Sequence, residues 1–240
     1  MPAKSSQIRW EERPIDRMSG SSQNRGNRAD YQAAFLGHVH RLIQLAYESL
    51  TPANYQASEE DDITGDLCKH MKFLTEDAPT ERWMRQFSIH DQDPVNDIKA
   101  VKTGQVRKGK RRPRMDIRLV SKSATRTQHF CIEAKRLYRS DSVSEYVDDA
   151  GVGAFVCDEY ASNDECGGMI GYIQSESSEY WLSKIEKKIR QLASGKKFSD
   201  TDVWSEAVFR TGPKICYKSH HRRDSGNSIV LFHVMLPFNP

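Results

Sequence analysis

The sequence predicts an α/β protein in which a mixed central β-sheet is flanked by α-helices. Two segments, 30–50 and 178–193, place apolar residues at the three- and four-residue steps of a helix. Two shorter runs, 115–120 and 130–134, have the length and the β-branched and aromatic content of strands. These patterns follow one another along 240 residues, which is long enough for one domain with a substantial core.

The composition is that of a globular protein with a large polar surface, at 37% hydrophobic and 29% charged residues. No apolar run approaches the roughly 20 residues needed to cross a bilayer, and the N-terminus lacks the apolar core of a signal peptide. The five cysteines are odd in number and lack zinc-ligand spacing. We therefore expect a cytoplasmic protein with no membrane association, no disulfide framework and no zinc site.

The first 28 residues are rich in Ser, Gln, Asn, Gly and Arg, which predicts a mobile polar and basic tail (1–28) followed by a single domain (29–240). The domain is expected to open with an amphipathic helix over 30–50, capped by Asp30. A second helix is expected to begin at Ser58, whose hydroxyl can cap it, with acidic residues in the first turn.

In the second helix, Ile63, Leu67 and Met71 form a core-facing stripe. Glu59 and Glu60 lie one turn before this stripe, close enough to the core-facing side of the helix for their side chains to face the sheet. An acidic helix start that only favours the helix dipole is the competing interpretation.

A first strand is expected over 83–90, where aromatic and β-branched residues nearly alternate. The polar segment 91–106 follows. The next residues, 107–114, form the densest basic run of the chain, which ends two residues before Asp116. Such a cluster can bind phosphate backbones through counterion release, although a run of like charge is also typical of a solvated loop. The residues expected to bind nucleic acid are Arg107, Lys108, Lys110, Arg111, Arg112 and Arg114, with His220 and Arg222 near the C-terminus.

The second half of the chain carries weaker patterns. Gly167, Gly168 and Gly171 indicate a helix packed tightly on the sheet. The expected order is a helix or loop over 136–149, the glycine-rich segment 151–173, a helix over 178–193 stopped by Gly195, and strands over 214–218 and 228–236 joined by a turn.

Three charged residues stand on the two strands 115–120 and 130–134, which the polar turn 121–127 joins into an antiparallel hairpin. Asp116 lies on the first strand, and Glu133 and Lys135 lie two apart on the second, so that they share a face. Two carboxylates on a rigid sheet suit a hard cation such as Mg²⁺. Lys135 could then orient or deprotonate an attacking water, or stabilise a pentavalent phosphate. An ordinary cross-strand salt bridge is the competing interpretation.

Asp116 followed by Glu133-Ala134-Lys135 resembles the PD-(D/E)xK motif of the restriction-endonuclease-like nuclease superfamily. Met115 stands where that motif usually has proline. The resemblance covers about residues 30–195 in the order and spacing of elements. It implies a restriction-endonuclease-like mixed sheet flanked by helices, with Asp116 and Glu133 binding Mg²⁺ or Mn²⁺ and Lys135 acting on the attacking water.

In this superfamily a glutamate from the first core helix often completes the metal site. The stretch Glu60-x-x-Ile63-Thr64-x-x-Leu67 is similar to that helix in several members, which favours Glu60 over Glu59 as the additional catalytic and metal-binding residue.

The function implied by the resemblance is metal-dependent hydrolysis of DNA by an endonuclease. Tyr160 with the Gly-Gly-Met-Ile-Gly-Tyr stretch at 167–172 resembles a pattern of nucleases in bacterial defence loci, which suggests anti-phage defence or restriction in a bacterial cytoplasm. The alternative is a non-catalytic or partner-activated DNA-binding subunit, with a second protein of a defence complex as its partner. An RNA substrate stays open, because a basic loop that follows the phosphate backbone does not choose between sugars. A homo-oligomer stays open as well.

Overall fold

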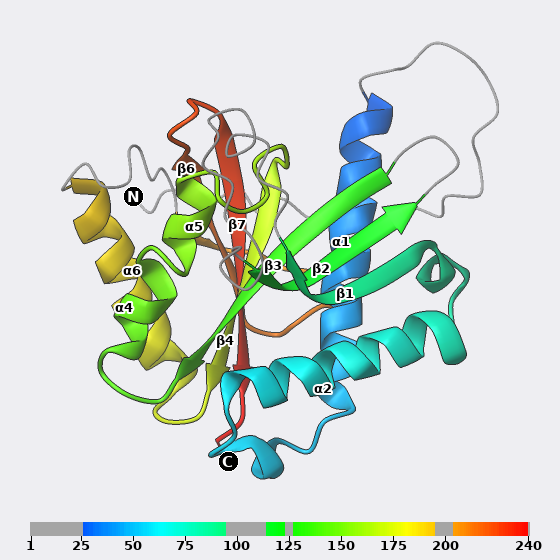
Figure 1. The fold of residues 1–240 in the computed structure, drawn as a ribbon, viewed down its shortest axis with the longest axis horizontal. Coiled ribbons are helices and arrows are strands. Elements are labelled where there is room, and N and C mark those ends of the chain that lie inside the picture. The colour runs from blue at the N-terminus through cyan, green and yellow to red at the C-terminus, as the bar shows by residue number, and fades with distance from the viewer. Residues whose placement is uncertain (1–25, 95–113, 123–126, 195–203, 240) are drawn as a thin grey trace, which may run out of the picture.

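The computed structural model describes residues 26–94, 114–122, 127–194 and 204–239. They build a seven-stranded mixed sheet in the order β1-β2-β3-β4-β7-β6-β5, with helices on both faces (Figure 1). The α/β class and the mixed sheet flanked by helices are thereby confirmed. The strands are β1 (Phe87–Pro94), β2 (Arg114–Lys122), β3 (Thr127–Leu137), β4 (Cys166–Ile173), β5 (Ser205–Glu206), β6 (Cys216–Arg222) and β7 (Ser228–Pro237).

The direction of the strands changes at β3. β1, β2 and β3 are antiparallel neighbours, whereas β3, β4 and β7 run parallel to one another, and β6 and β5 then return antiparallel. The predicted hairpin is confirmed, with Ile117 opposite Ile132 and Leu119 opposite Phe130. β3 therefore belongs both to an antiparallel hairpin and to a parallel core.

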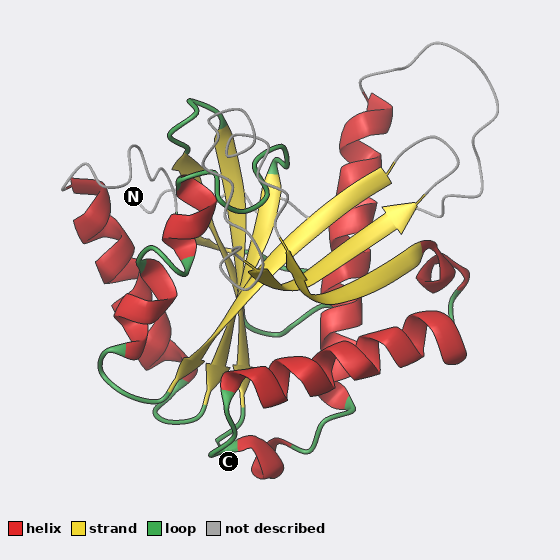
Figure 2. Cartoon of the chain, in the orientation of Figure 1, coloured by secondary structure: helices red, strands yellow, loops and turns green. Residues whose placement is uncertain are grey.

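Helices cover both faces of the sheet (Figure 2). The long helix α1 (Gly26–Glu48) and α2 (Glu60–Lys72) pack their apolar stripes on one face, through residues such as Leu42 and Leu67. On the other face lie α4 (Ser142–Val147), α5 (Val152–Val156) and α6 (Ser178–Ser194), with Trp181 and Ile185 buried against β4 and β7. Short turns complete the order: 3-10 helices η1 (Pro52–Tyr55) and η3 (Arg82–Gln86), and a π-helical turn η2 (Phe73–Asp77).

Two expected helix starts are wrong. α1 begins at Gly26, so that Asp30 lies inside the helix and does not cap it; residues 1–25 of the predicted tail lie outside the described part. α2 begins at Glu60 with Glu59 as its N-cap residue, because the Ser58 hydroxyl donates to the Asn54 carbonyl in the preceding turn. The acidic first turn is as expected, with Glu60, Asp61 and Asp62 at the positive end of the helix dipole.

The first strand also begins later than predicted. Residues 82–86 form the 3-10 turn η3, and β1 runs from Phe87 to Pro94, because Trp83 turns aside to stack on His38 at 4.1 Å between ring centroids. The two strands of the hairpin are longer than expected at both ends, and 123–126 of the predicted turn lie outside the described residues.

The expected glycine-rich helix is wrong over Cys166–Ile173, which forms β4 in the middle of the sheet. The glycines make room for neighbouring side chains: a Cβ on Gly168 would lie 2.7 Å from the Phe130 ring, and one on Gly167 would lie 2.7 Å from the Phe155 ring. Close packing is therefore the role of these glycines, on a strand and not on a helix.

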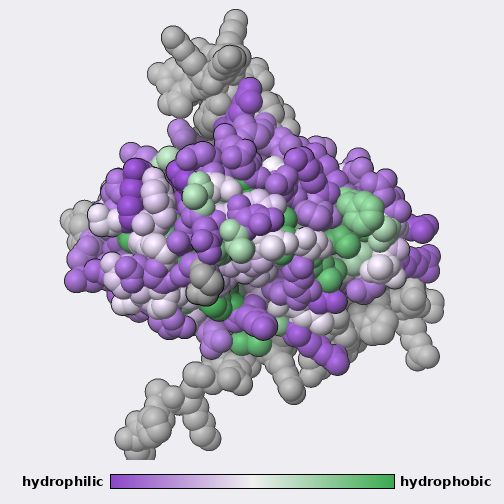
Figure 3. All heavy atoms as spheres, turned by 90° about the horizontal axis from the view of Figure 1, so that it is seen from below, coloured by the Kyte–Doolittle hydropathy of each residue, from purple (hydrophilic) through white to green (hydrophobic). Residues whose placement is uncertain are grey.

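The C-terminal elements are confirmed with shifted ends. α6 extends over Ser178–Ser194, and Gly195 lies outside the described residues. β6 continues to Arg222, so that the final turn is shorter than expected. Seen from below, the described surface is mostly hydrophilic with small separate apolar patches (Figure 3). Within the described ranges, no helix is both long enough and apolar enough to span a membrane.

Candidate active site

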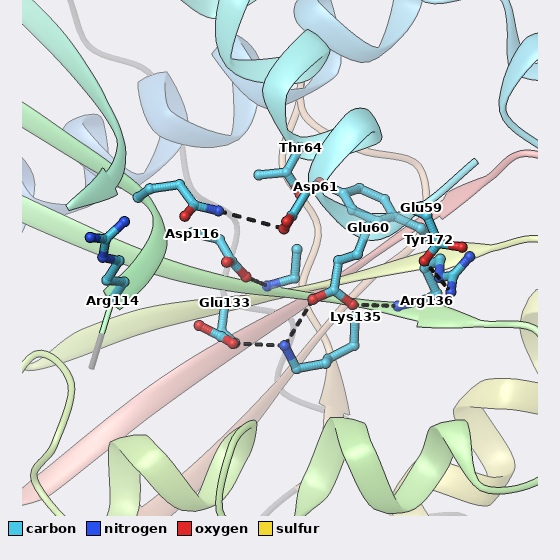
Figure 4. Close-up of polar contacts among 12 residues, drawn as sticks. Glu59, Glu60, Asp61, Thr64, Arg114, Asp116, Glu133, Lys135, Arg136 and Tyr172 are labelled. Carbon is cyan, nitrogen blue, oxygen red and sulfur yellow. Dashed lines mark hydrogen bonds and ion pairs between the residues drawn. The ribbon is translucent and has the colours of Figure 1, made fainter. Parts of the chain in front are cut away.

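Asp116 lies at the position where the backbone pairing of β2 with β3 ends. The paired register of the two strands begins at Ile117 opposite Ile132, one residue further along β2. In place of a further backbone pair, the Asp116 carboxylate accepts a hydrogen bond from the Ala134 backbone N–H, at 2.8 Å to Oδ2 (Figure 4). The side chain is therefore held at the edge of β3, next to Glu133 and Lys135.

Lys135 is the centre of an ion-pair cluster. Its Nζ donates to Glu133 Oε1 at 2.7 Å and to Glu60 Oε1 at 3.0 Å, and both carboxylates point at the amine in Figure 4. The Lys135 side chain is only 13% exposed, so that the pairs are largely shielded from solvent. The hairpin of β2 and β3 and the helix α2, which lies far from it in the sequence, thus bring the four predicted residues together.

The start of α2 is fixed on β3 by Arg136. Its backbone N–H donates to Glu60 Oε2 at 3.1 Å, and its guanidinium donates to the Ser58 carbonyl at 3.0 Å. The same guanidinium pairs with Glu59 at 2.7 Å, where the Glu59 side chain is 71% exposed. Glu60 therefore faces Lys135, whereas Glu59 lies toward solvent; the preference for Glu60 as a metal-binding residue stays a prediction.

The two β-strand carboxyl groups hold their protons tightly. Burial, and then the Asp116 charge, raise the pKa of Glu133 to about 8, against the pull of Lys135. Burial also raises the pKa of Asp116 to about 6, opposed by Lys135 and by the Ala134 N–H. Burial lowers the pKa of Lys135, but the surrounding carboxylates outweigh it and raise that pKa above its ordinary value. Within the described part of the site, the single ammonium group of Lys135 faces three carboxyl groups, those of Glu133, Glu60 and Asp116.

The donor set fits a divalent cation through its two strand carboxylates. Glu133 Oε2 is buried and has no hydrogen-bond partner among the described residues, which is costly for a carboxylate oxygen. Oxygen ligands of this kind are those that Mg²⁺ and Mn²⁺ prefer. Among the described residues, no group of three or more His, Cys, Asp or Glu side chains is placed to hold a metal, because Lys135 occupies the space between Glu60 and Glu133.

Tyr160 is a neighbour of the site whose role the sequence did not show. Its hydroxyl donates to the Arg114 carbonyl at 2.9 Å, two residues before Asp116. Burial, and then the charges of Glu133 and Asp116, raise the pKa of this phenol. Tyr160 therefore fixes the first residues of β2 beside the carboxylates, although no local pattern links it to a residue so distant in the sequence.

The residues predicted to bind nucleic acid are divided by the structure. Arg114 is exposed at the first position of β2, and Figure 4 shows it on the far side of Asp116 from Lys135. Residues 107–112 lie outside the described part of the chain. His220 and Arg222 stand on β6, separated from β3 by β4 and β7, so that the structure does not bring them to the carboxylates.

Comparisons of the chain with protein-family models, with curated proteins and with solved structures found no match.

Proposed function

We propose that this chain is a metal-dependent endonuclease of the restriction-endonuclease-like kind, which hydrolyses phosphodiester bonds of DNA. The observation that carries the proposal is the carboxylate pair of half-buried Asp116 and buried Glu133, with an oxygen of Glu133 that lacks a partner among the described residues and with Lys135 two residues along the same strand. A purely structural salt bridge would need one carboxylate for one ammonium, whereas here three carboxylates surround Lys135.

Asp116 and Glu133 would hold Mg²⁺ or Mn²⁺, with Glu60 reaching the ion directly or through a water. When bound, the ion would supply Lewis-acid stabilisation of the phosphate and of the leaving oxygen. Lys135 donates to Glu133 and to Glu60. Beside a bound ion, its ammonium group would donate to the attacking water or to the developing negative charge. The Asp116 and Ala134 contact keeps the first carboxylate in place throughout.

Supercoiled plasmid is the substrate that tests this proposal. The purified protein is incubated with Mg²⁺ or Mn²⁺, and parallel reactions contain EDTA, Asp116→Ala or Lys135→Ala. The matched control is Lys69→Ala, because Lys69 also pairs with a carboxylate but is exposed on α2, away from the site. We expect nicking or linearisation by the wild type and the control only. Cleavage that survives both site substitutions would refute the proposal.

One observation favours a second candidate, a partner-activated or non-catalytic DNA-binding subunit. Lys135 closes the gap between Glu60 and Glu133, so that the described site must open before it can take a metal with three carboxylates. This candidate predicts a gel shift with DNA but no metal-dependent cleavage, and Lys135→Ala would then bind as the wild type does. A role in bacterial anti-phage defence, alone or within a complex, rests on the resemblance of the sequence and is part of the proposal.

A further inference from the structure

Strand β1 contains one residue in a backbone conformation that strands avoid. Gln92 has a φ of 52°, in the left-handed region, which residues other than glycine adopt at a cost in free energy. The other non-glycine residues of positive φ in the described part of the chain, Asp158, Ala161 and Glu176, lie in turns between elements, where the chain must change direction. Gln92 lies within a strand, so its conformation needs another reason.

This distortion lies directly across from Asp116. The antiparallel register of β1 and β2 places Gln92 opposite Asp116, yet this pair is omitted while the pairs on either side of it are formed. On the other side of β2, the pairing with β3 begins only at Ile117. In the described sheet, Asp116 therefore lacks a ladder partner on both neighbouring strands. Breaks of this kind re-aim side chains and are frequent next to active sites.

The side chain of Gln92 extends from β1 to the first turn of α2. Its Nε2 lies 3.5 Å from Asp61 Oδ1, which is a long hydrogen bond. Asp61 is in turn close to Asp116: burial is the main cause of the raised pKa of Asp116, and the charges of Glu60 and Asp61 add to it. Figure 4 shows Asp61 on the α2 side of Asp116. The carboxamide of Gln92 therefore stands at the Asp116 end of the candidate site.

A carboxamide at this place suits the binding of an anion beside carboxylates. Gln92 and Asp61 are both exposed, so that a ligand can reach them. A carboxamide has two N–H donors, and Asp61 takes one of them, which leaves the second able to donate to an oxygen of a ligand. An ammonium group at the same place would form ion pairs with the carboxylates, as Lys135 does with Glu60. The uncharged donor is bound to Asp61 more weakly and can therefore serve a phosphate.

On the basis of the proposed function, we propose that Gln92 is a substrate-binding residue, whose carboxamide donates a hydrogen bond to a phosphate oxygen of DNA at the Asp116 end of the site. In a regular strand, the side chain of Gln92 would follow the alternation of β1. The left-handed backbone instead aims it at the start of α2, beside Asp116. The conformation thus has a reason in binding, separate from the roles of Asp116, Glu133 and Lys135.

Two substitutions of Gln92 separate the side chain from the backbone. Gln92→Ala removes the carboxamide and keeps the unfavourable φ, whereas Gln92→Gly removes the carboxamide and relieves the backbone. In plasmid cleavage with Mg²⁺ at varied DNA concentration, both should raise KM about three- to tenfold, as for the loss of one hydrogen bond. The kcat should stay within about twofold, because the contact is made in the ground state as well. The Tm of Gln92→Gly should exceed that of Gln92→Ala by roughly 2–4 °C.

Glu176 supplies the matched control. Its φ of 54° is nearly that of Gln92, and its exposed side chain lies in the turn between β4 and α6, which carries none of the predicted site residues. Glu176→Ala and Glu176→Gly should therefore show the same difference in Tm, with the KM of the wild type. Binding of a fluorescent DNA duplex in EDTA, where cleavage does not occur, should show the loss in Gln92→Gly with an unchanged salt dependence, because the carboxamide is uncharged.

A wild-type KM for Gln92→Gly would overturn the inference, because the bend of β1 alone would then meet the need of the site. A loss of kcat at unchanged KM would also overturn it, since Gln92 would then act by positioning Asp116. If Gln92→Ala fails to fold by circular dichroism, Gln92→Gly decides alone. A wild type that cuts DNA while the Gln92 variants keep its KM refutes only the Gln92 contact, whereas a wild type that neither cuts nor binds DNA refutes both proposals. If the wild type binds DNA without cutting it, the nuclease proposal is refuted and the binding assay decides on Gln92.

Discussion

Replacing Glu133 by Gln should change how the stability of the protein depends on pH. Glu133 is 5% exposed, and its pKa of about 8 in the folded protein stands well above the ordinary value of 4.5. Below pH 4.5 this carboxyl group is protonated in both the folded and the unfolded protein, and its stabilising contribution to the free energy of unfolding is fully present. That contribution is lost as the pH rises toward about 8, because the buried group must then ionise.

The size of the effect follows from the same pKa values. At about 1.4 kcal/mol for each tenfold change in proton affinity, Glu133 alone would lower the free energy of unfolding by about 5 kcal/mol between these limits. Only part of this titration takes place between pH 5 and pH 8, which leaves about 3–4 kcal/mol from Glu133. Asp116, whose pKa is also raised, to about 6, lowers the stability in the same direction over this range. For a chain of this size, the contribution of Glu133 corresponds to about 6–15 °C in Tm.

Thermal unfolding in EDTA at pH 5 and at pH 8 measures this. The wild type should lose stability between the two values, and Glu133→Gln should lose much less, because Gln does not ionise. Any cost of the new amide inside the site is present at both pH values and cancels in the comparison. Added Mg²⁺ should raise the Tm of the wild type at pH 8 and leave that of the variant unchanged. Parallel pH profiles for the two proteins would refute the electrostatic account of the site.

Four further substitutions test other parts of the structure. Tyr160→Phe removes the hydrogen bond to the Arg114 carbonyl but keeps the buried ring; plasmid cleavage should fall about tenfold while the free energy of unfolding changes by about 1 kcal/mol. Gly168→Ala should cost about 1–3 kcal/mol in urea unfolding because the new Cβ meets the Phe130 ring, whereas Gly65→Ala in α2, with open space around it, should gain about 0.5–1 kcal/mol. Glu60→Gln should raise the Mg²⁺ concentration for half-maximal cleavage at least threefold; an unchanged requirement would remove Glu60 from the metal site.

Local patterns were sufficient to predict the elements that carry strong periodicity. The long helices and the hairpin of β2 and β3 follow from apolar spacing and from the polar turn between the strands. The glycine pattern of 166–173 predicts a helix, because glycines lack the β-branched side chains that indicate a strand, whereas the structure has the strand β4 there. The strand is specified by the rings of Phe130 and Phe155, which fill the space above the glycines and belong to distant parts of the sequence. The helix cap at Ser58 was wrong for a similar reason, since a hydroxyl can bond to the preceding turn as well as to the helix.

The candidate site was predictable as a set of residues, but its contacts were not. The spacing of Glu133 and Lys135 on one strand places them on one face, and the resemblance to a nuclease motif singled out Asp116 and Glu60. The pairing of Lys135 with both Glu60 and Glu133 depends on how α2 docks beside β3. The hydrogen bond from the Ala134 N–H to Asp116 depends on where the pairing of β2 with β3 ends. Docking of this kind is decided by tertiary packing, which a single sequence does not reveal.

The position of β7 delays the completion of the sheet during synthesis. β7 is made after the other strands of this sheet, yet it lies between β4 and β6 and pairs with both. Until Ser228–Pro237 has left the ribosome, β4 has an open edge and the parallel core that supports β3 is incomplete. At about 5–20 residues per second, the emerging chain thus waits several seconds between the completion of its carboxylate-bearing strands and the closure of the sheet behind them.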